Sequence, residues 1–274
     1  MNKFSKKLLL VLLVSPLLLS GQKSVHHSFA PGKLWFDTNG DIINAHGGGI
    51  LYHEGTYYWF GEHKGENSNA ALVGVTCYSS SDLQNWKFER IALPVSEDTG
   101  SPIVKGCVIE RPKVIYNKKA NKFVMYFHLE LKGQGYHAAK VGVAVSDQVT
   151  GPYTFLKSGR VNAGKWPLNV TKTQKNSKQK ESDFKAWTPE WLEAMDNGLF
   201  LRRDFAGGQM SRDMTLFVDD DDQAYHIYSS EDNASLHVAE LTDDYQDYTG
   251  SIYAYFRLST TKRRQFLRKP GHIG

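Results

Sequence analysis

Alternating apolar positions mark a hairpin in "SRDMTLFVDDDDQAYHIYSSED", residues 211–232. Three apolar residues alternate with two others over 214–218, and a second alternating run covers 225–228. The four aspartates between these runs, Asp219–Asp222, have turn chemistry. Alternation with a period of two predicts two antiparallel strands with one buried face. A charged residue, Asp213, stands directly before the first of these strands.

The same plan occurs twice earlier in the chain, in "HGGGILYHEGTYYWFGEHK" (46–64) and "ERPKVIYNKKANKFVMYFHLE" (110–130). Each stretch has a polar head, an apolar strand, a turn and a second strand rich in aromatic residues. Each of the three hairpins is followed by a further apolar run that ends at an acidic turn. The distance from the head to the turn aspartate is 36 residues from His46 to Asp82, 37 from Glu110 to Asp147 and 30 from Asp213 to Asp243.

Three near-equal units of three or four strands predict an all-β fold of the β-propeller type, in which first strands surround a central channel. We place the blade units at about 34–105, 106–160 and 200–250, within a domain of residues 29–250 that has an insertion at 161–199. A residue at the head of an innermost strand faces the mouth of the channel. We therefore expect His46, Glu110 and Asp213 to converge.

The insertion has two different parts. "KTQKNSKQKESDFK" (172–185) is polar and rich in lysine, and predicts a solvated loop. "WTPEWLEAMDNGLF" (187–200) predicts a short helix, with Thr188 as its cap, Pro189 at its first position and Gly198 near its end. The tryptophans of this region either pack normally or form a stacking platform at the rim of a pocket; they are Trp166, Trp187 and Trp191.

Residues 1–21 have the pattern of an export signal. Three lysines precede an apolar run from Leu8, and the small residues Ser20 and Gly21 follow it. The apolar run is short for a membrane span, so we expect an exported protein, periplasmic or extracellular, with no stable span after cleavage; a retained anchor is the alternative. In an oxidising compartment, Cys77 and Cys107 either form a disulfide or remain isolated buried thiols.

The net charge of +4 comes from the two ends of the chain. Residues 1–21 carry three lysines, and residues 251–274 carry six basic residues, with no acidic residue in either segment. The remainder has 24 basic and 29 acidic residues, a net charge of −5. An acidic body repels a phosphate backbone, so nucleic-acid binding is disfavoured. Contact of the basic tail with anionic lipid or polysaccharide is an alternative role, although the tail has no clear amphipathic period.

The hairpins at 46–64, 110–130 and 211–232, together with "VGVAVSDQVTGPYTFL", resemble glycoside hydrolase family 43, and most closely its exo-β-1,3-galactanase-like branch. The likeness runs from about Leu34 to Gly250. It implies a five-bladed β-propeller, of which only about three blades are encoded here. The implied activity is inverting hydrolysis of glycosidic bonds in galactose-containing polysaccharides, with an oligo- or polysaccharide as partner. It implies no required cofactor, and it leaves open a Ca²⁺ ion in the channel and the oligomeric state.

The resemblance assigns roles to two of the strand heads. Asp213 in "SRDM" corresponds to the aspartate that modulates the pKa of the acid and orients it. Its alternative is a strand-end cap or an ion pair with Arg212. Glu110 in "ERPKV" corresponds to the glutamate of the sugar subsite in the galactanase branch. Its alternative is pairing with Arg111 or Lys113.

His46 stands where many family members have the catalytic aspartate base, a departure that the galactanase-like branch shares. Contact with sugar hydroxyls and a buried structural hydrogen bond are both open for this histidine. Glu62, at the end of the second strand, and Arg212 are further substrate-binding candidates. We predict no metal site, and the Asp219–Asp222 run lacks EF-hand spacing. The glycines after His46 are not a phosphate loop, because no helix start or Lys-Ser/Thr follows them.

The resemblance also implies a general-acid glutamate at the head of the next blade, soon after Gly250. Residues 251–274 contain neither Asp nor Glu. We therefore expect a basic tail unrelated to the family, produced by truncation or by a change of reading frame. Beside the glycoside hydrolase stand two alternatives, a non-catalytic carbohydrate-binding propeller and a non-functional fragment.

Overall fold

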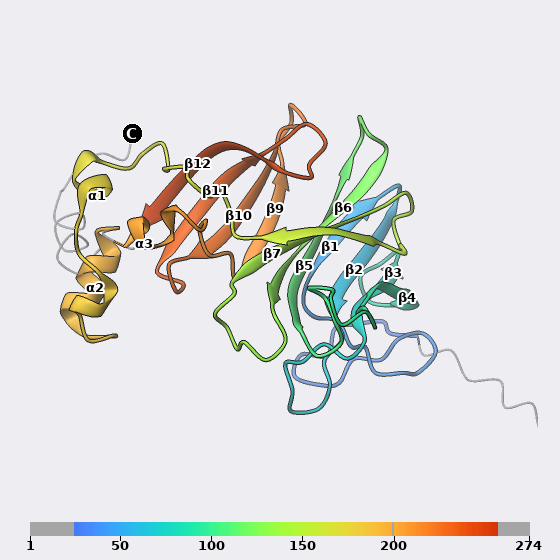
Figure 1. Cartoon of the computed structure of the whole chain (residues 1–274). Helices are drawn as coiled ribbons and strands as arrows, with labels where there is room; N and C mark the ends of the chain where they lie inside the picture. Colours follow the sequence, from blue (N-terminus) through green and yellow to red (C-terminus); the bar gives the residue numbers. More distant parts are fainter. Residues whose placement is uncertain (1–24, 199, 257–274) are drawn as a thin grey trace, which may run out of the picture.

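The computed structural model describes residues 25–198 and 200–256. Within them, twelve strands form three antiparallel sheets of four strands each (Figure 1). The order of the strands in every sheet follows the order of the chain, so each sheet is one propeller blade built by successive hairpins. The prediction of an all-β fold with about three blades is confirmed.

The three sheets are blade 1, blade 2 and blade 3 in chain order. Blade 1 consists of β1 (His46–His53), β2 (Thr56–Glu62), β3 (Gly74–Ser80) and β4 (Lys87–Pro94). Blade 2 consists of β5 (Val108–Asn117), β6 (Lys122–Glu130), β7 (Lys140–Ser146) and β8 (Thr154–Gly159). Blade 3 consists of β9 (Met214–Val218), β10 (Ala224–Ser230), β11 (Ser235–Leu241) and β12 (Tyr248–Phe256).

Strand β12 continues past residue 250, where the predicted third unit ends. It pairs with β11 as far as Phe256, opposite Ser235. Blade 3 therefore includes six residues that we had assigned to the basic tail. The rest of that tail and the predicted export signal at 1–21 lie outside the described residues. In the described part of the chain, no helix has the length and apolar character needed to cross a membrane.

Blade 2 lies between the other two blades, and alternate residues of β6 pack in opposite directions. Met125 and Phe127 join a core with residues of blade 1, whereas Val124 and Tyr126 join a core with residues of blade 3. A strand that is buried on both faces needs apolar residues at consecutive positions. This explains why β6 is buried at every position from Phe123 to Glu130.

The innermost strands β1, β5 and β9 follow one another from blade to blade, β1 against β5 and β5 against β9. Three glycines allow the first of these contacts. The side chain of Lys113 donates hydrogen bonds to the carbonyl oxygens of Gly47 and Gly48, at 3.1 and 2.9 Å. A Cβ atom on Gly48 would lie 1.7 Å from the carbonyl oxygen of Phe60, and one on Gly49 would lie 2.5 Å from Lys113 Cδ. At Gly48 the obstacle is the backbone of β2, so no other residue type fits there without a backbone shift, whereas a side chain at Gly49 would displace Lys113.

The insertion between blades 2 and 3 contains short helices: α1 (Lys172–Asn176), the 3₁₀ helix η1 (Glu181–Asp183), α2 (Pro189–Asp196) and α3 (Leu201–Phe205). They lie beyond blade 3, at the end of β12 (Figure 1). Helix α2 begins as predicted: the Thr188 side chain accepts a hydrogen bond from the Trp191 amide, and Pro189 is the first helical residue. The segment at 172–185, predicted as a loop, instead contains α1 and η1. Thr171 and Gln174 make the capping box that begins α1.

The tryptophans of the insertion have different environments. Trp191 is buried against Phe200, and Trp166 stacks on Phe205 at a centroid distance of 4.3 Å. These two pack normally. Trp187 is 71% exposed and remains the one of the three that presents its ring to solvent.

Both cysteines, Cys77 and Cys107, are free and buried. Burial raises the pKa of the Cys107 thiol to about 11 and also raises that of Cys77. Of the two alternatives left open by the sequence, the structure has the isolated thiols, which act as small apolar side chains in the core between blades 1 and 2.

Candidate functional site

The heads of the three innermost strands meet at one end of the blades. Arg111 Nε, next to Glu110 in β5, donates a hydrogen bond of 2.8 Å to Asp213 Oδ1, directly before β9. A Cβ atom on Gly47 in β1 would lie 2.4 Å from Arg111 Nη1 and 3.1 Å from Glu62 Oε1. His46 pairs with Glu62 across the β1–β2 ladder. The structure thus brings together side chains that are up to 167 residues apart in the sequence.

A β-bulge in β5 turns Arg111 toward Asp213. The pairing with β6 shifts between Glu110 and Lys113, and Arg111 has a φ angle of +55°, in the left-handed region. Such a backbone costs about 1–3 kcal/mol and persists only where its surroundings fix it. Asp213 has a side-chain exposure of 67%, so its ion pair contributes about 1 kcal/mol or less to stability. The pair therefore orients the carboxylate more than it stabilises the fold. Asp213 pairs with Arg111, and not with the neighbouring Arg212 that we had considered.

Glu110 is a buried carboxylate with partners on both of its oxygen atoms. Tyr136 Oη donates a hydrogen bond of 2.7 Å to Oε1, and His128 Nδ1 lies 3.3 Å from Oε2. His128 Nε2 in turn donates a hydrogen bond of 2.8 Å to Glu130 Oε1. These partners replace Arg111 and Lys113, which were the alternatives for Glu110 in the sequence. The carboxylate is held in one orientation by a phenol and an imidazole.

The contacts along this row of side chains shift the pKa values of His128 and Glu110. Burial alone would lower the pKa of His128, but its interactions with Glu110 and Glu130 outweigh burial and raise the pKa. Burial would raise the pKa of Glu110, and the contacts with His128 and Tyr136 lower it instead. Glu110 is therefore a charged carboxylate, which is an acceptor for hydroxyl hydrogen bonds.

Glu62 has the opposite character. It is 3% exposed, and burial raises its pKa to about 7, with a further contribution from the charge of Glu110. Lys64 Nζ lies 3.7 Å from Glu62 Oε1, beyond hydrogen-bond distance. The site therefore pairs one carboxylate that stays charged with one carboxyl group that exchanges its proton near neutral pH.

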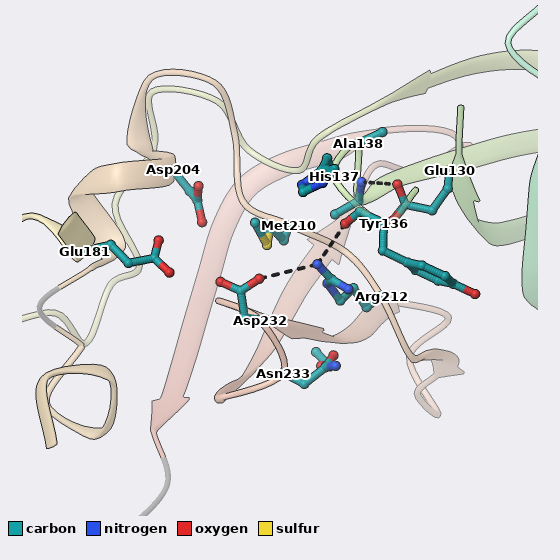
Figure 2. Close-up of polar contacts among 12 residues, drawn as sticks. Glu130, Tyr136, His137, Ala138, Glu181, Asp204, Met210, Arg212, Asp232 and Asn233 are labelled. Atoms are coloured by element: carbon teal, nitrogen blue, oxygen red, sulfur yellow. Dashed lines mark hydrogen bonds and ion pairs between the residues drawn. The ribbon is translucent and has the colours of Figure 1, made fainter. Parts of the chain in front are cut away.

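The two remaining candidates differ in their surroundings. His46 is exposed, so the buried structural hydrogen bond considered for it does not occur. Its pKa is lowered by partial burial and by Lys64, which favours the neutral imidazole. Arg212 donates a hydrogen bond of 2.9 Å from Nη2 to the carbonyl oxygen of Tyr136, and the same nitrogen lies 3.4 Å from Asp232 Oδ1 (Figure 2). It contacts the loop that carries Tyr136.

Sequence reasoning did not identify the partners of Glu110. The available signal was "HLE" at 128–130, which places two polar residues on the same face of an otherwise apolar strand. Nothing local marks Tyr136, which lies in a loop and also accepts a hydrogen bond of 2.9 Å from Asn69 Nδ2 of blade 1. Among the described residues, no group of three or more His, Cys, Asp or Glu side chains is placed to hold a metal ion.

No protein-family model matches the chain, and no curated protein matches it. Solved structures do. A GH43 β-1,3-galactosidase solved with galactodeoxynojirimycin has 59% identity and a TM-score of 0.80, covering 83% of this chain and 66% of that chain. A second GH43 β-1,3-galactosidase has 36% identity and a TM-score of 0.60, covering 82% of this chain and 38% of that one.

A third similar structure is the exo-β-1,3-galactanase from Phanerochaete chrysosporium solved with galactose. It has 35% identity and a TM-score of 0.59, covering 80% of this chain and 40% of that chain. The chain therefore spans just under two thirds of the length of the first protein and about two fifths of the length of the other two.

Proposed function

Since this chain belongs to glycoside hydrolase family 43, we propose that it acts on terminal galactose in β-1,3-linked galactan, of the kind found in arabinogalactan-type polysaccharides. The observation that carries this proposal is Glu110, a buried and charged carboxylate fixed by Tyr136 and His128 where three strand heads meet. Two of the similar structures were solved with galactodeoxynojirimycin and with galactose, which supports a galactose-shaped ligand.

In this proposal Glu110 accepts hydrogen bonds from sugar hydroxyl groups, and His46, Glu62 and Arg212 lie around the same sugar. A carboxylate that accepts two hydroxyl groups selects a sugar by the geometry of those groups. Glu62, with a pKa of about 7, adds a group that donates or accepts a proton according to pH. Asp213, oriented by Arg111, takes the position that modulates and orients the general acid.

Inverting hydrolysis uses a general acid on the leaving oxygen and a base on the attacking water, with the two carboxyl groups about 6.5–9.5 Å apart. Residues 251–274, where the family resemblance places that acid, contain neither Asp nor Glu. This observation favours a second candidate function, binding of galactose-containing saccharides without turnover. Loss of the acid alone would lower the rate by about 10²–10⁴-fold.

The test uses β-1,3-galactan oligosaccharides with the purified full chain. Galactose release followed by NMR reports turnover and the anomeric configuration of the product, and calorimetry reports binding. We expect binding, and we expect Glu110→Gln to weaken it by at least about tenfold, since charged hydrogen bonds contribute about 1.5–3 kcal/mol. Glu89→Gln is the matched control, because Glu89 is a carboxylate on the outermost strand of blade 1 with its own partner, Ser79.

Absence of both turnover and binding in a cooperatively folded protein would overturn the proposal. Binding without turnover would favour the saccharide-binding alternative.

We also propose that residues 1–21 direct export to the periplasm or the cell exterior. Sequencing the N-terminus of protein recovered outside the cytoplasm tests this, and an intact Met1 on that protein would contradict it.

A further inference from the structure

The loop between β6 and β7 is held by arginine side chains on three successive carbonyl groups. Arg212 Nη2 donates to the carbonyl oxygen of Tyr136 at 2.9 Å. Arg160 Nη2 donates to that of His137 at 2.9 Å, and Arg160 Nε donates to that of Ala138 at 3.0 Å. Loops usually leave their carbonyls to solvent. Here each of three carbonyls in a row has a charged donor.

The end of the same loop is fixed by its own backbone. The Ala139 amide donates to Glu130 Oε2 at 3.0 Å, and the Ala139 carbonyl accepts from the Ser211 amide at 2.9 Å. Glu130 is the carboxylate that also accepts from His128. The loop is thus tied to the row of side chains that ends at Glu110.

Two buried or half-buried aspartates connect the two arginines to a third. Asp204 Oδ1 accepts from Arg160 Nη1 and from Arg203 Nε, both at 3.1 Å. Asp232 accepts from Arg203 Nη1 at 2.8 Å, and Arg212 Nη2 lies 3.4 Å from its other oxygen. The charges therefore alternate along a continuous chain of contacts, which we call the arginine clamp: Arg160, Asp204, Arg203, Asp232 and Arg212. Both ends of the clamp are hydrogen-bonded to the loop.

The clamp combines three parts of the fold. Arg203 and Asp204 belong to helix α3 of the insertion, and Asp232 lies in the turn between β10 and β11. Asp232 has a φ angle of +54°, in the left-handed region, with Glu231 and Asn233 beside it at +44° and +68°. Three consecutive non-glycine residues in this conformation are strained. The contacts of Asp232 with two arginines hold this strained turn in place.

We propose that the arginine clamp is a positioning device for the sugar site, which sets Tyr136 on Glu110 before a saccharide binds. A group held in advance loses less conformational freedom on binding, which raises affinity. Arg160 acts through the loop, because its Nε, Nη1 and Nη2 atoms all have protein acceptors. This inference rests on the proposed function and adds to it a role for the helical insertion.

The first test measures the loop without any ligand. In Arg160→Gln we expect amide hydrogen exchange in the peptide covering 131–139 to become at least about tenfold faster, because two of the three carbonyl contacts are lost. Arg90→Gln is the matched control and should leave exchange in the 131–139 peptide unchanged. Arg90, in β4 of blade 1, donates from Nη1 to the Gly151 carbonyl at 2.6 Å, in the loop between β7 and β8. Unchanged exchange in the 131–139 peptide of Arg160→Gln would overturn the inference.

The second test asks whether Arg160 acts through Tyr136, with galactodeoxynojirimycin as the probe in calorimetry. We expect Arg160→Gln and Tyr136→Phe each to weaken binding by about tenfold, and the double variant to weaken it by little more than Tyr136→Phe alone. Independent effects, which multiply to about a hundredfold, would overturn the inference. Failure of the wild-type chain to bind the probe would instead overturn the proposed function, while the exchange measurement would still decide whether the clamp holds the loop.

Arg160→Lys guards against a variant that does not fold. It keeps the positive charge opposite Asp204, but an ammonium group lacks the fork geometry that serves two carbonyls and a carboxylate together. We expect this variant to unfold cooperatively, to show exchange in the loop between that of the wild type and Arg160→Gln, and to recover part of the probe affinity. Loop exchange and affinity equal to the wild type would contradict a positioning role for the guanidinium.

Discussion

Blades 2 and 3 have the same four-stranded plan and different surroundings. Blade 2 packs against another sheet on each face, through Met125 and Phe127 on one side and Tyr126 on the other. Blade 3 packs against blade 2 on one face, and its other face exposes large apolar side chains: Phe217, Leu236, Tyr253 and Tyr255. Burial alternates along β10 and β11 of blade 3, whereas β6 of blade 2 is buried at every position from Phe123 to Glu130. The presence or absence of a second sheet beside the strand accounts for this difference.

Removing one large side chain from each blade should show the contrast most strongly. Phe127→Ala should destabilise the protein by about 3–5 kcal/mol, because Phe127 is fully buried and its loss leaves a cavity. Phe217→Ala should change the free energy of unfolding by about 1 kcal/mol or less, since half of that residue is exposed. Urea denaturation measures both. Similar losses for the two variants would show that the outer face of blade 3 is covered in solution.

The packed face of blade 3 predicts a dependence of stability on pH. His226 is fully buried there, burial lowers its pKa to about 3, and Tyr248 Oη lies 2.9 Å from its Nδ1. The native state keeps this histidine neutral, whereas the unfolded chain protonates it below its ordinary pKa of about 6.5. Stability should therefore fall as pH decreases from about 6.5 toward 3, by about 2–3 kcal/mol at pH ~4.5.

Denaturation curves at several pH values check this expectation. His226→Gln should reduce the slope of stability against pH between about 6.5 and 4.5, because glutamine does not titrate. His27→Gln, at an exposed histidine outside the blades, is the matched control and should leave the slope unchanged. Equal slopes in the wild type and His226→Gln would contradict a neutral buried histidine.

The smallest effect is expected from polar substitution on the outer face of blade 3. Leu236 and Tyr255 face each other across the β11–β12 ladder, and both are exposed. Leu236→Thr with Tyr255→Thr keeps strand-forming residues and should change stability by about 1 kcal/mol or less, while it lowers self-association in light scattering. Val143→Thr in blade 2 is the comparison. It should lower the free energy of unfolding by about 1–3 kcal/mol, because the introduced threonine hydroxyl would be buried. A larger loss in blade 3 would reverse the contrast.

Features that depend on neighbouring residues in the sequence were predictable. The hairpins at the head of each blade follow from apolar alternation and turn residues, and the start of helix α2 follows from Thr188 and Pro189. The helices α1 and η1 were missed because a lysine-rich segment has no apolar period, and a single cap at Thr171 starts α1. The end of β12 was missed because residues 251–274 were assigned by their overall charge, although "SIYAYF" at 251–256 contains no basic residue.

Contacts in the site depend on register, and the sequence does not contain that information locally. The bulge between Glu110 and Lys113 turns Arg111 toward Asp213, and it exists only in the pairing of β5 with β6. The sequence neighbour Arg212 was therefore the wrong partner for Asp213, which pairs with Arg111. Tyr136 reaches Glu110 from a loop 26 residues away, held there by arginines from two other segments.

The glycines at 47–49 have a consequence for the engineering of this domain. Gly47 and Gly49 leave room for the side chains of Arg111 and Lys113 in β5, and Gly48 leaves room for the backbone of β2 in the same blade. A first blade transplanted from another protein would dock against β5 only if its leading strand lacked side chains at positions 47 and 49. The triplet thus limits which blades can be recombined, whatever chemistry they carry.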